Sequence, residues 1–337
     1  MKVYAPGKLI LSGEHSVVHG APALAMAVNR YAVATVSHEH LPQILFELAD
    51  LAHRSHLSFS GLVELKNRIK EKYHRFIRGE YTIKQVLHKP FELAQVAIGV
   101  ITEAMNVSLP HGVKIHVQSD IPIGCGMGSS AATIVSVMQA VSHYLKMPMQ
   151  QDELYRFALE TENMQHGQSS GLDLQLSMRG GCVYMHEQRL EARPVPAFPL
   201  YFVNTGAPLS STGECVNHTS QILRMDTTLL NEFANVTNAM DAALQRQSQS
   251  AMQVVVRNNH RLLTQVGVVP EKVQQFIADI ENEAGAAKIC GAGSIDGDHG
   301  GMVMVLIDDT YPLQALVDQF GFTLLPVAGE SRGVYVA

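Results

Sequence analysis

A glycine-rich segment in the first half of the chain limits most strongly what this sequence can fold into. It reads I-P-I-G-C-G-M-G-S-S-A-A at residues 121–132. Before it, apolar and polar residues alternate over residues 113–118, which predicts a half-buried strand. After it, apolar residues recur at helical spacing over residues 131–145, which predicts an amphipathic helix. The segment therefore predicts a strand and a helix that are joined by a turn of glycines.

Such a turn suits a phosphate group. Glycines let backbone N–H groups turn inward and approach a ligand closely, and a helix N-terminus adds partial positive charge. Ser129 and Ser130 add hydroxyls for a phosphate or a metal ion. The segment is not the common P-loop, because no lysine stands at the helix start, and its glycine spacing differs from the dinucleotide fingerprint. The alternative is a tight turn with serine caps, and phosphate binding is favoured over it.

Charge and composition exclude several classes of protein. The chain has 25 Lys and Arg against 31 Asp and Glu, a net charge of −6, which argues against a nucleic-acid-binding surface. Its 337 residues suggest two domains at roughly 150 residues each. No apolar run approaches the ~18 residues of a membrane span. With no signal peptide and no C-terminal peroxisomal signal, we expect a cytoplasmic protein without a membrane partner.

Strand and helix patterns interleave along the chain and predict an α+β protein. The first forty residues read as strands and tight turns, and residues 41–105 read as helical. Three prolines within residues 194–199 mark a linker, so we place the domains at 1–193 and 194–337. In the second half we expect a strand at 200–203, helices over 213–285, strands at 302–307 and 333–336, and a short helix opening at Tyr311.

Other candidates for chemistry are weaker when each is taken alone. Lys8 follows a turn at Pro6-Gly7 and would ordinarily be a surface residue, and Glu14-His15 would ordinarily be structural. Glu162 extends the apolar stripe of a helix over 152–165, so it either needs a cation or metal partner or lies at an exposed helix end. Asp173 follows in a turn of small residues. Two carboxylates and a lysine near a phosphate-binding turn suit phosphoryl transfer.

Two further segments have a simple structural interpretation. The glycine-rich stretch 288–301 ends at the strand over 302–307, and a hairpin connection is slightly favoured for it. The basic residues over 66–72 alternate with the apolar residues of a helix, and a solvated helix face is favoured over an anion-binding patch. The four cysteines are widely spaced, so neither a zinc site nor a disulfide framework is expected.

Taken together, these segments resemble the GHMP superfamily of small-molecule kinases. Its three motifs occur in order, as A-P-G-K at residues 5–8, P-x-G-x-G-x-G-S-S-A at 122–131 and G-A-G at 291–293. Within the superfamily, the segment A-P-G-K-L-I-L-S-G-E-H-S-V-V-H-G at 5–20 is similar to that of the mevalonate kinases. The stretch 162–173 resembles their E-x-x-x-H-G-x-P-S-G-x-D. The chain departs from that pattern with Ser169 for proline, Leu174 for asparagine, and Ser294–Asp298 within the last glycine run.

The resemblance implies a two-domain GHMP kinase fold with the active site between the domains. It implies ATP-dependent phosphorylation of the terminal hydroxyl of (R)-mevalonate, in the route to isoprenoids and sterols, with ATP and Mg²⁺ as cofactors and a homodimer as a possible assembly. The alternatives are another GHMP kinase, acting on phosphomevalonate or a sugar, and a non-catalytic homologue that binds ATP or an isoprenoid.

The resemblance also implies a role for individual residues. Asp173 would take the proton from the mevalonate hydroxyl, and Lys8 would polarise that hydroxyl. Glu162 and Ser130 would ligate the Mg²⁺ that bridges the β- and γ-phosphates. The triphosphate would be held by Gly124, Gly126, Gly128, Ser129, Ser130 and Ala131. The mevalonate pocket would be formed by Lys8, Glu14, His15, Asp173, Gly291, Ala292 and Gly293.

Overall fold

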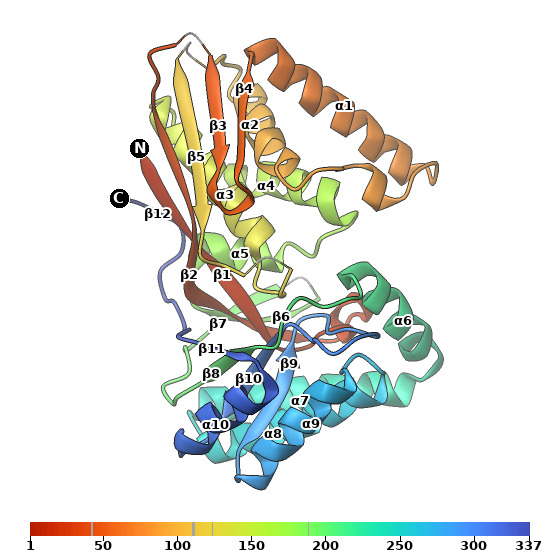
Figure 1. Cartoon of the computed structure of the whole chain (residues 1–337). Coiled ribbons are helices and arrows are strands. Elements are labelled where there is room, and N and C mark those ends of the chain that lie inside the picture. The colour runs from red at the N-terminus through yellow and green to blue at the C-terminus, as the bar shows by residue number, and fades with distance from the viewer. Residues whose placement is uncertain (42, 110–111, 123, 188) are drawn as a thin grey trace.

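The structure is a computed structural model that describes residues 1–41, 43–109, 112–122, 124–187 and 189–337, so Ile123 of the glycine-rich segment lies outside it. The described chain forms two mixed layers of sheet and helix, one above the other in Figure 1. None of its helices is both long and apolar enough to cross a membrane.

The first sheet holds the N-terminal strands. Its order is β12-β1-β2-β5-β3-β4, with β6 paired to β2 and β7 paired to β6. Only β3 and β5 among the pairs of described residues run parallel. The strands are β1 (Lys2–Ser12), β2 (Ala23–His38), β3 (Ile44–Leu48), β4 (His53–Leu57), β5 (Val113–Ser119), β6 (Cys182–His186), β7 (Arg189–Arg193) and β12 (Tyr335–Val336).

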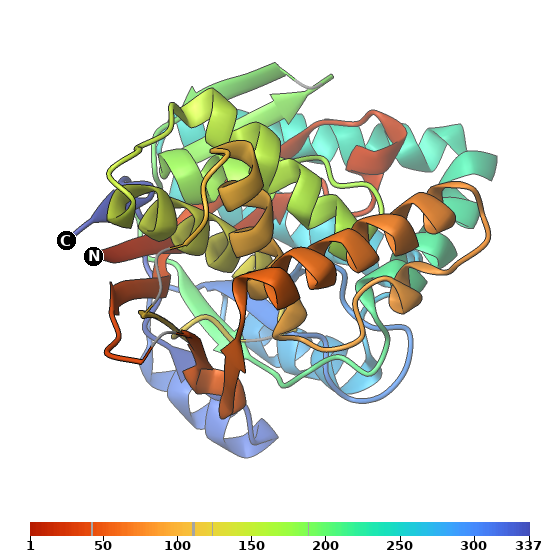
Figure 2. The same cartoon turned by 90° about the horizontal axis from the view of Figure 1, so that it is seen from above.

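Helices cover one face of this sheet, with α3 against β1 and β2 (Figures 1 and 2). They are α1 (Phe59–Ile77), α2 (Glu92–Ala104), α3 (Ser129–Tyr144), α4 (Gln151–His166) and α5 (Leu172–Arg179), with short 3₁₀ helices η1 (Ser16–His19), η2 (Ala49–Leu51) and η3 (Ile83–Gln85). The predicted strand–turn–helix unit is confirmed, because β5 precedes the glycine-rich segment and α3 follows it. The helix predicted over 152–165 is α4.

The second sheet has the order β11-β8-β10-β9 and carries the C-terminal helices. The strands are β8 (Tyr201–Asn204), β9 (Ala286–Cys290), β10 (Met302–Leu306) and β11 (Thr323–Leu325), and the helices are α6 (Thr212–Met225), α7 (Thr227–Gln245), α8 (Gln249–Gln265), α9 (Glu271–Asn282) and α10 (Tyr311–Phe320). The strand expected at 200–203, the helices over 213–285 and the helix opening at Tyr311 are confirmed.

One hydrophobic core crosses from the first layer to the second. Along β10, Met302, Met304 and Leu306 pack into the core that also holds the strands of the first sheet. The alternating Val303 and Val305 pack into a separate core on the other face. This alternation follows from the twofold period of a strand. The second sheet is therefore buried on both faces, and it stands directly against the first layer.

The chain passes from the first sheet to the second between the end of β7 at residue 193 and the start of β8 at residue 201. The last strand, β12, returns to the first sheet and pairs with β1, so the two termini lie side by side (Figures 1 and 2). The domain boundary at residue 193 stays a prediction.

The segment 44–57 contradicts the sequence analysis. It was expected to be helical, and it forms the hairpin of β3 and β4. The apolar run of β3 has the length of a strand as well as of a short helix segment, and only its pairing with β5, where Ile44 lies opposite Val113, decides between them. In the basic stretch, Lys66 is buried and pairs with Glu103 rather than facing solvent.

The turn expected at Pro6-Gly7 is absent, because β1 runs through it. A shift of the β1–β2 register falls between these two residues, which makes them a bulge inside the strand. Proline is tolerated at a bulge because no ladder hydrogen bond needs its missing N–H. A Cβ on Gly7 would lie 2.7 Å from Met127 O, so the bulge brings β1 against the glycine-rich segment.

Candidate active site

The glycine-rich segment and β1 are packed tightly together. Gly124, Gly126 and Gly128 have φ of 77°, 78° and 72°, values that favour glycine. A Cβ on Gly128 would lie 2.8 Å from Cγ of Lys8, and the Lys8 N–H donates to Met127 O at 2.9 Å. The turn therefore lies directly beside the lysine of the first motif.

The N-terminus of α3 has no side-chain cap. Gly128 occupies its N-cap position, and no side chain there accepts a hydrogen bond from the first turn. Ser129 and Ser130 stand in that turn, where unpaired N–H groups and the helix dipole attract anions. This is the environment predicted for a phosphate.

Lys8 and Asp173 form an ion pair beside this turn. The Lys8 Nζ lies 3.2 Å from Oδ2 of Asp173, and the lysine is buried while the Asp173 side chain is 30% exposed. Asp173 stands in the first turn of α5, behind Gly171. The expectation that Lys8 alone would be a surface residue is wrong, because β1 runs through the interior of the layer.

Glu162 is 2% exposed and lies at the end of α4. Its Oε2 accepts a hydrogen bond from the Ser169 hydroxyl at 2.7 Å. Burial, together with the nearby Asp173 carboxylate, raises the pKa of Glu162 to about 7, against the opposing effects of Ser169 and Lys8. The buried stripe predicted for this helix is confirmed, and Glu162 belongs to the same cluster as Lys8 and Asp173.

Ser130 completes the cluster from the side of α3. Its hydroxyl lies 3.2 Å from Nε2 of His166, the last residue of α4. The chain from α4 to α5 therefore meets the start of α3 at the glycine-rich turn. Residues predicted from three separated segments, at 8, 130 and 162–173, are brought together here.

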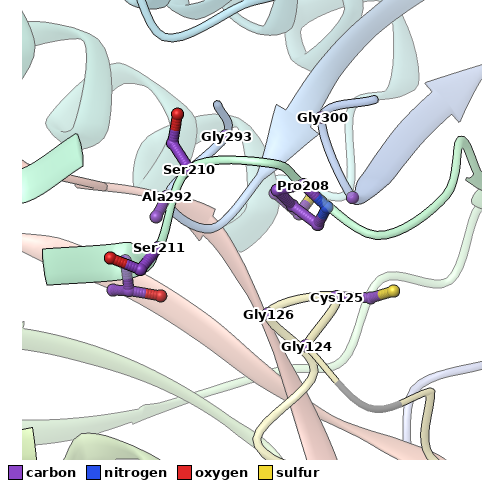
Figure 3. Close-up of a pocket in the computed structure, with 12 residues that line it drawn as sticks. Gly124, Cys125, Gly126, Pro208, Ser210, Ser211, Ala292, Gly293 and Gly300 are labelled. Atoms are coloured by element: carbon purple, nitrogen blue, oxygen red, sulfur yellow. The ribbon is translucent and has the colours of Figure 1, made fainter. Parts of the chain in front are cut away.

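The second glycine loop, residues 291–301, joins β9 to β10 and faces the first. A Cβ on Gly126 would lie 3.2 Å from Cys290 O, so the two loops are in contact. A cavity of about 280 Å³ lies between them and the segment 208–212, and Gly124, Gly126, Ala292 and Gly293 are in its wall (Figure 3). Lys8, Glu162 and Asp173 are not among the residues that line it.

Glu14 and His15 lie in the interior between the two sheets. Glu14 is buried and pairs with Lys288 of β9, whose Nζ also donates to Leu11 O at 2.9 Å. The His15 ring lies 3.0 Å from the Thr219 hydroxyl and 3.1 Å from Ala292 O. Because a carbonyl oxygen only accepts, Nε2 of His15 donates to Ala292. These contacts favour support of the second glycine loop.

Acid is expected to destabilise the fold through His15. Burial lowers the pKa of His15 from 6.5 to about 4, although its bond to Ala292 opposes this. Between these two values the unfolded chain binds a proton at His15 and the folded chain does not. The stabilisation is therefore complete above pH 6.5 and is lost as the pH falls toward 4, by about 3 kcal/mol in total.

Urea unfolding at pH 7, 6 and 5 would measure this loss. His15→Gln keeps a donor for Ala292 and removes the titrating ring, so its unfolding free energy should fall less steeply. Equal slopes for the two proteins would rule out His15 as the source.

The sequence analysis missed three partners in this region. It did not identify Lys288 as the partner of Glu14. It also did not identify Ser169 as the partner of Glu162 or Thr219 as the partner of His15. Lys288 and Glu14 are 274 residues apart, and neither carries a local signal that points to the other. Ser169 was marked only as a departure from the resembled motif.

Known proteins resemble this chain in sequence and in fold. Residues 92–181 match the family of GHMP kinases N terminal domain. The chain is 28% identical over 319 residues to the mevalonate kinase of Pyrococcus furiosus, and the match covers 87% of each chain. It superposes on the mevalonate kinase of Methanococcus jannaschii with a TM-score of 0.81 at 24% identity, over 98% of both chains.

The same fold occurs in a galactokinase from Lactococcus lactis, with a TM-score of 0.74 at 17% identity, over 99% of this chain and 94% of that one. The fold alone therefore does not select the substrate. The family match and the curated relative agree with the two glycine loops and with the ion pair between Lys8 of β1 and Asp173 of α5: residues 92–181 form a GHMP kinases N terminal domain, and the chain as a whole is similar to mevalonate kinases.

Proposed function

We propose that this chain transfers the γ-phosphoryl group of ATP to the terminal hydroxyl of (R)-mevalonate, giving 5-phosphomevalonate and ADP. The observation that carries the proposal is the Lys8–Asp173 pair, 3.2 Å apart beside the uncapped N-terminus of α3. A carboxylate, a cation and a phosphate-binding turn at one place are the parts that phosphoryl transfer requires. The relative that supports mevalonate as the acceptor matches 87% of the chain.

Asp173 would act as the general base. Its carboxylate accepts the proton of the mevalonate hydroxyl while that oxygen forms a bond to the γ-phosphorus. The bond from the γ-phosphorus to the oxygen shared with the β-phosphate breaks, and ADP leaves with the electron pair. Lys8 offsets the negative charge that develops on the attacking oxygen. Gly124, Gly126 and Gly128, with Ser129 and Ala131, would hold the phosphates through the N–H groups of the turn and of α3.

Glu162 and Ser130 fit a magnesium ion. Mg²⁺ prefers oxygen ligands, and it is commonly bound by one or two carboxylates together with substrate phosphates. Among the described residues, no group of three or more His, Cys, Asp or Glu side chains could hold a metal ion. The buried Glu162 beside Asp173 is a concentration of negative charge that a cation would offset. When bound, the ion would neutralise charge on the β- and γ-phosphates.

The substrate pocket is proposed beside the second glycine loop. Gly291, Ala292 and Gly293 belong to the loop that faces the glycine-rich turn, and Ala292 and Gly293 line the cavity. Glu14 and His15 would act from behind this loop, since both side chains are buried and are bonded to Lys288 and to Ala292 O. The homodimer and the cytoplasmic location stay predictions.

Two other functions fit less well. A kinase for phosphomevalonate needs a basic pocket for the substrate phosphate. In the basic stretch 66–72, Lys66 and Lys70 already form ion pairs with Glu103, so they are poor candidates for binding that phosphate. A non-catalytic homologue would have no use for a carboxylate base and a metal ligand. Asp173 and Glu162 are both present, and they lie in one cluster.

An assay of ADP release tests the proposal directly. The enzyme is supplied with ATP and Mg²⁺ and with mevalonate, phosphomevalonate or galactose in parallel. We expect turnover with mevalonate to exceed the other two by orders of magnitude. An enzyme that prefers either of the others, or that releases no ADP with mevalonate, would refute the assigned substrate.

Lys8→Met is expected to reduce kcat by ~10²- to 10³-fold, the usual effect of losing a group that stabilises developing charge. Methionine keeps an apolar stem against Gly128, so the melting temperature should change little. Lys70→Met, whose ammonium pairs with Glu103 and Glu160 away from the turn, is the control and should keep its activity. A Lys8 variant that loses its melting transition would show a structural role instead.

A further inference from the structure

The turn between α4 and α5 contains Ser169, whose hydroxyl can donate its hydrogen bond to one neighbour only. Ser169 Oγ accepts a hydrogen bond from the Gly171 N–H at 3.0 Å and lies 2.7 Å from Oε2 of Glu162. Its own N–H donates to Oδ1 of Asn163 at 2.8 Å. A hydroxyl has one hydrogen to donate, and the bond between these two side chains runs from the Ser169 hydroxyl to Oε2 of Glu162. The hydrogen of Ser169 is therefore given to Glu162.

This bond fixes the carboxylate of Glu162. A hydrogen bond from a hydroxyl to a carboxylate is among the strong ones, and here the acceptor is buried at 2% exposure, where few waters compete. Because the carboxylate is planar, holding Oε2 also sets the place of Oε1. The position of Ser169 is itself set from both sides, by Asn163 on α4 and by Gly171 at the start of α5.

We propose that Ser169 is a positioning residue, whose hydroxyl orients the Glu162 carboxylate toward the divalent cation that accompanies ATP. The inference rests on the proposed function only in placing that cation at Glu162. Hydrogen-bond partners behind a metal ligand typically contribute roughly 10- to 100-fold to metal affinity. Ser169 stands where the resembled motif has a proline, which offers no hydroxyl, so this contact is a property of this chain's own sequence.

A serine that only closed the turn would give a different result from one that orients Glu162. Ser169→Ala removes the hydroxyl and keeps the N–H bond to Asn163. Ser169→Thr keeps both, and Ser169→Cys keeps the volume with a weak donor. Ser142→Ala is the matched control, because it removes a hydroxyl that donates to the carbonyl of Gln139 on α3.

The measurement is Mn²⁺ binding to the full-length protein with ADP present, followed by electron paramagnetic resonance. We expect Ser169→Ala to weaken Mn²⁺ binding roughly tenfold, Ser169→Cys to fall between, and Ser169→Thr and Ser142→Ala to stay within threefold of the wild type. ADP affinity in EDTA should be the same in all of them. The cysteine variant keeps the test intact if the alanine variant does not fold.

Two results would overturn the inference. One is wild-type Mn²⁺ affinity in Ser169→Ala, and the other is a threonine variant that binds as weakly as the alanine variant. The titration contains no mevalonate, so it is independent of the assay of substrate turnover. A protein that shows the expected order of Mn²⁺ affinities but no turnover of mevalonate would reject only the proposed substrate.

Discussion

Asp173→Ala is expected to lower kcat with ATP and mevalonate by at least ~10²-fold, the usual contribution of a general base. Asp173 stands in the first turn of α5 with its side chain 30% exposed, so its carboxylate can reach a bound hydroxyl. The phosphates are proposed to lie on the turn at 124–130, which belongs to another segment. ATP affinity should therefore stay within a few-fold of the wild type, as measured by calorimetry.

Asp173→Asn separates charge from shape. The amide has nearly the same size and cannot take the proton, so its kcat should fall as far as that of the alanine variant. Asp152→Ala is the matched control, since that side chain is 97% exposed at the start of α4, and its activity should be unchanged. If Asp173→Asn retained kcat within a few-fold, Asp173 would not be the base.

Lys288→Met is expected to reduce the free energy of unfolding by about 3–5 kcal/mol, the range for breaking a buried ion pair on one side. Lys288 is fully buried on β9 and contacts two groups at the end of β1 and just after it, Leu11 O and the Glu14 carboxylate. The other oxygen of Glu14 has no hydrogen-bond partner among the described residues. Removing the ammonium would leave a buried carboxylate without its cation, and urea denaturation would measure the loss.

Two variants test this explanation. In Glu14→Met/Lys288→Met both charges are gone, so a good part of the lost stability should return. Lys66→Met is the control for removing a buried lysine. Its partner Glu103 is 51% exposed and also pairs with Lys70, so the loss should be about 1 kcal/mol. Equal losses of unfolding free energy in Lys66→Met and Lys288→Met would show that the buried Glu14–Lys288 pair stabilises the fold no more than the Lys66–Glu103 pair does.

Elements with a local period were predictable. The strand β5, the helices α3 and α4 and the strand β10 follow from alternation or helical spacing over consecutive residues. The hairpin of β3 and β4 was not predictable in this way. Its first strand pairs with β5, where Ile44 lies opposite Val113. A pairing between segments so far apart in the sequence depends on the partner strand as well as on the segment itself.

The candidate site also has parts that local sequence predicts and parts that it does not. The glycine-rich turn, its helix N-terminus and the residue types suited to phosphoryl transfer could be read from the sequence, because backbone freedom at glycine and the charge of a side chain are local properties. The arrangement of these groups in space could not be read from the sequence. Lys8 is buried because β1 passes through the interior, and Glu14 meets Lys288 only once β9 packs against β1.

The sequence by itself thus determined which chemical groups this protein has and which short elements carry them. The tertiary structure alone decided which groups meet: Lys8 with Asp173, Glu162 with Ser169, and Glu14 with Lys288. The physical reason is that an ion pair or a hydrogen bond depends on separation in space and on burial. For Lys8 with Asp173 and for Glu14 with Lys288, both are set by the packing of the sheets and helices between segments that lie far apart along the chain.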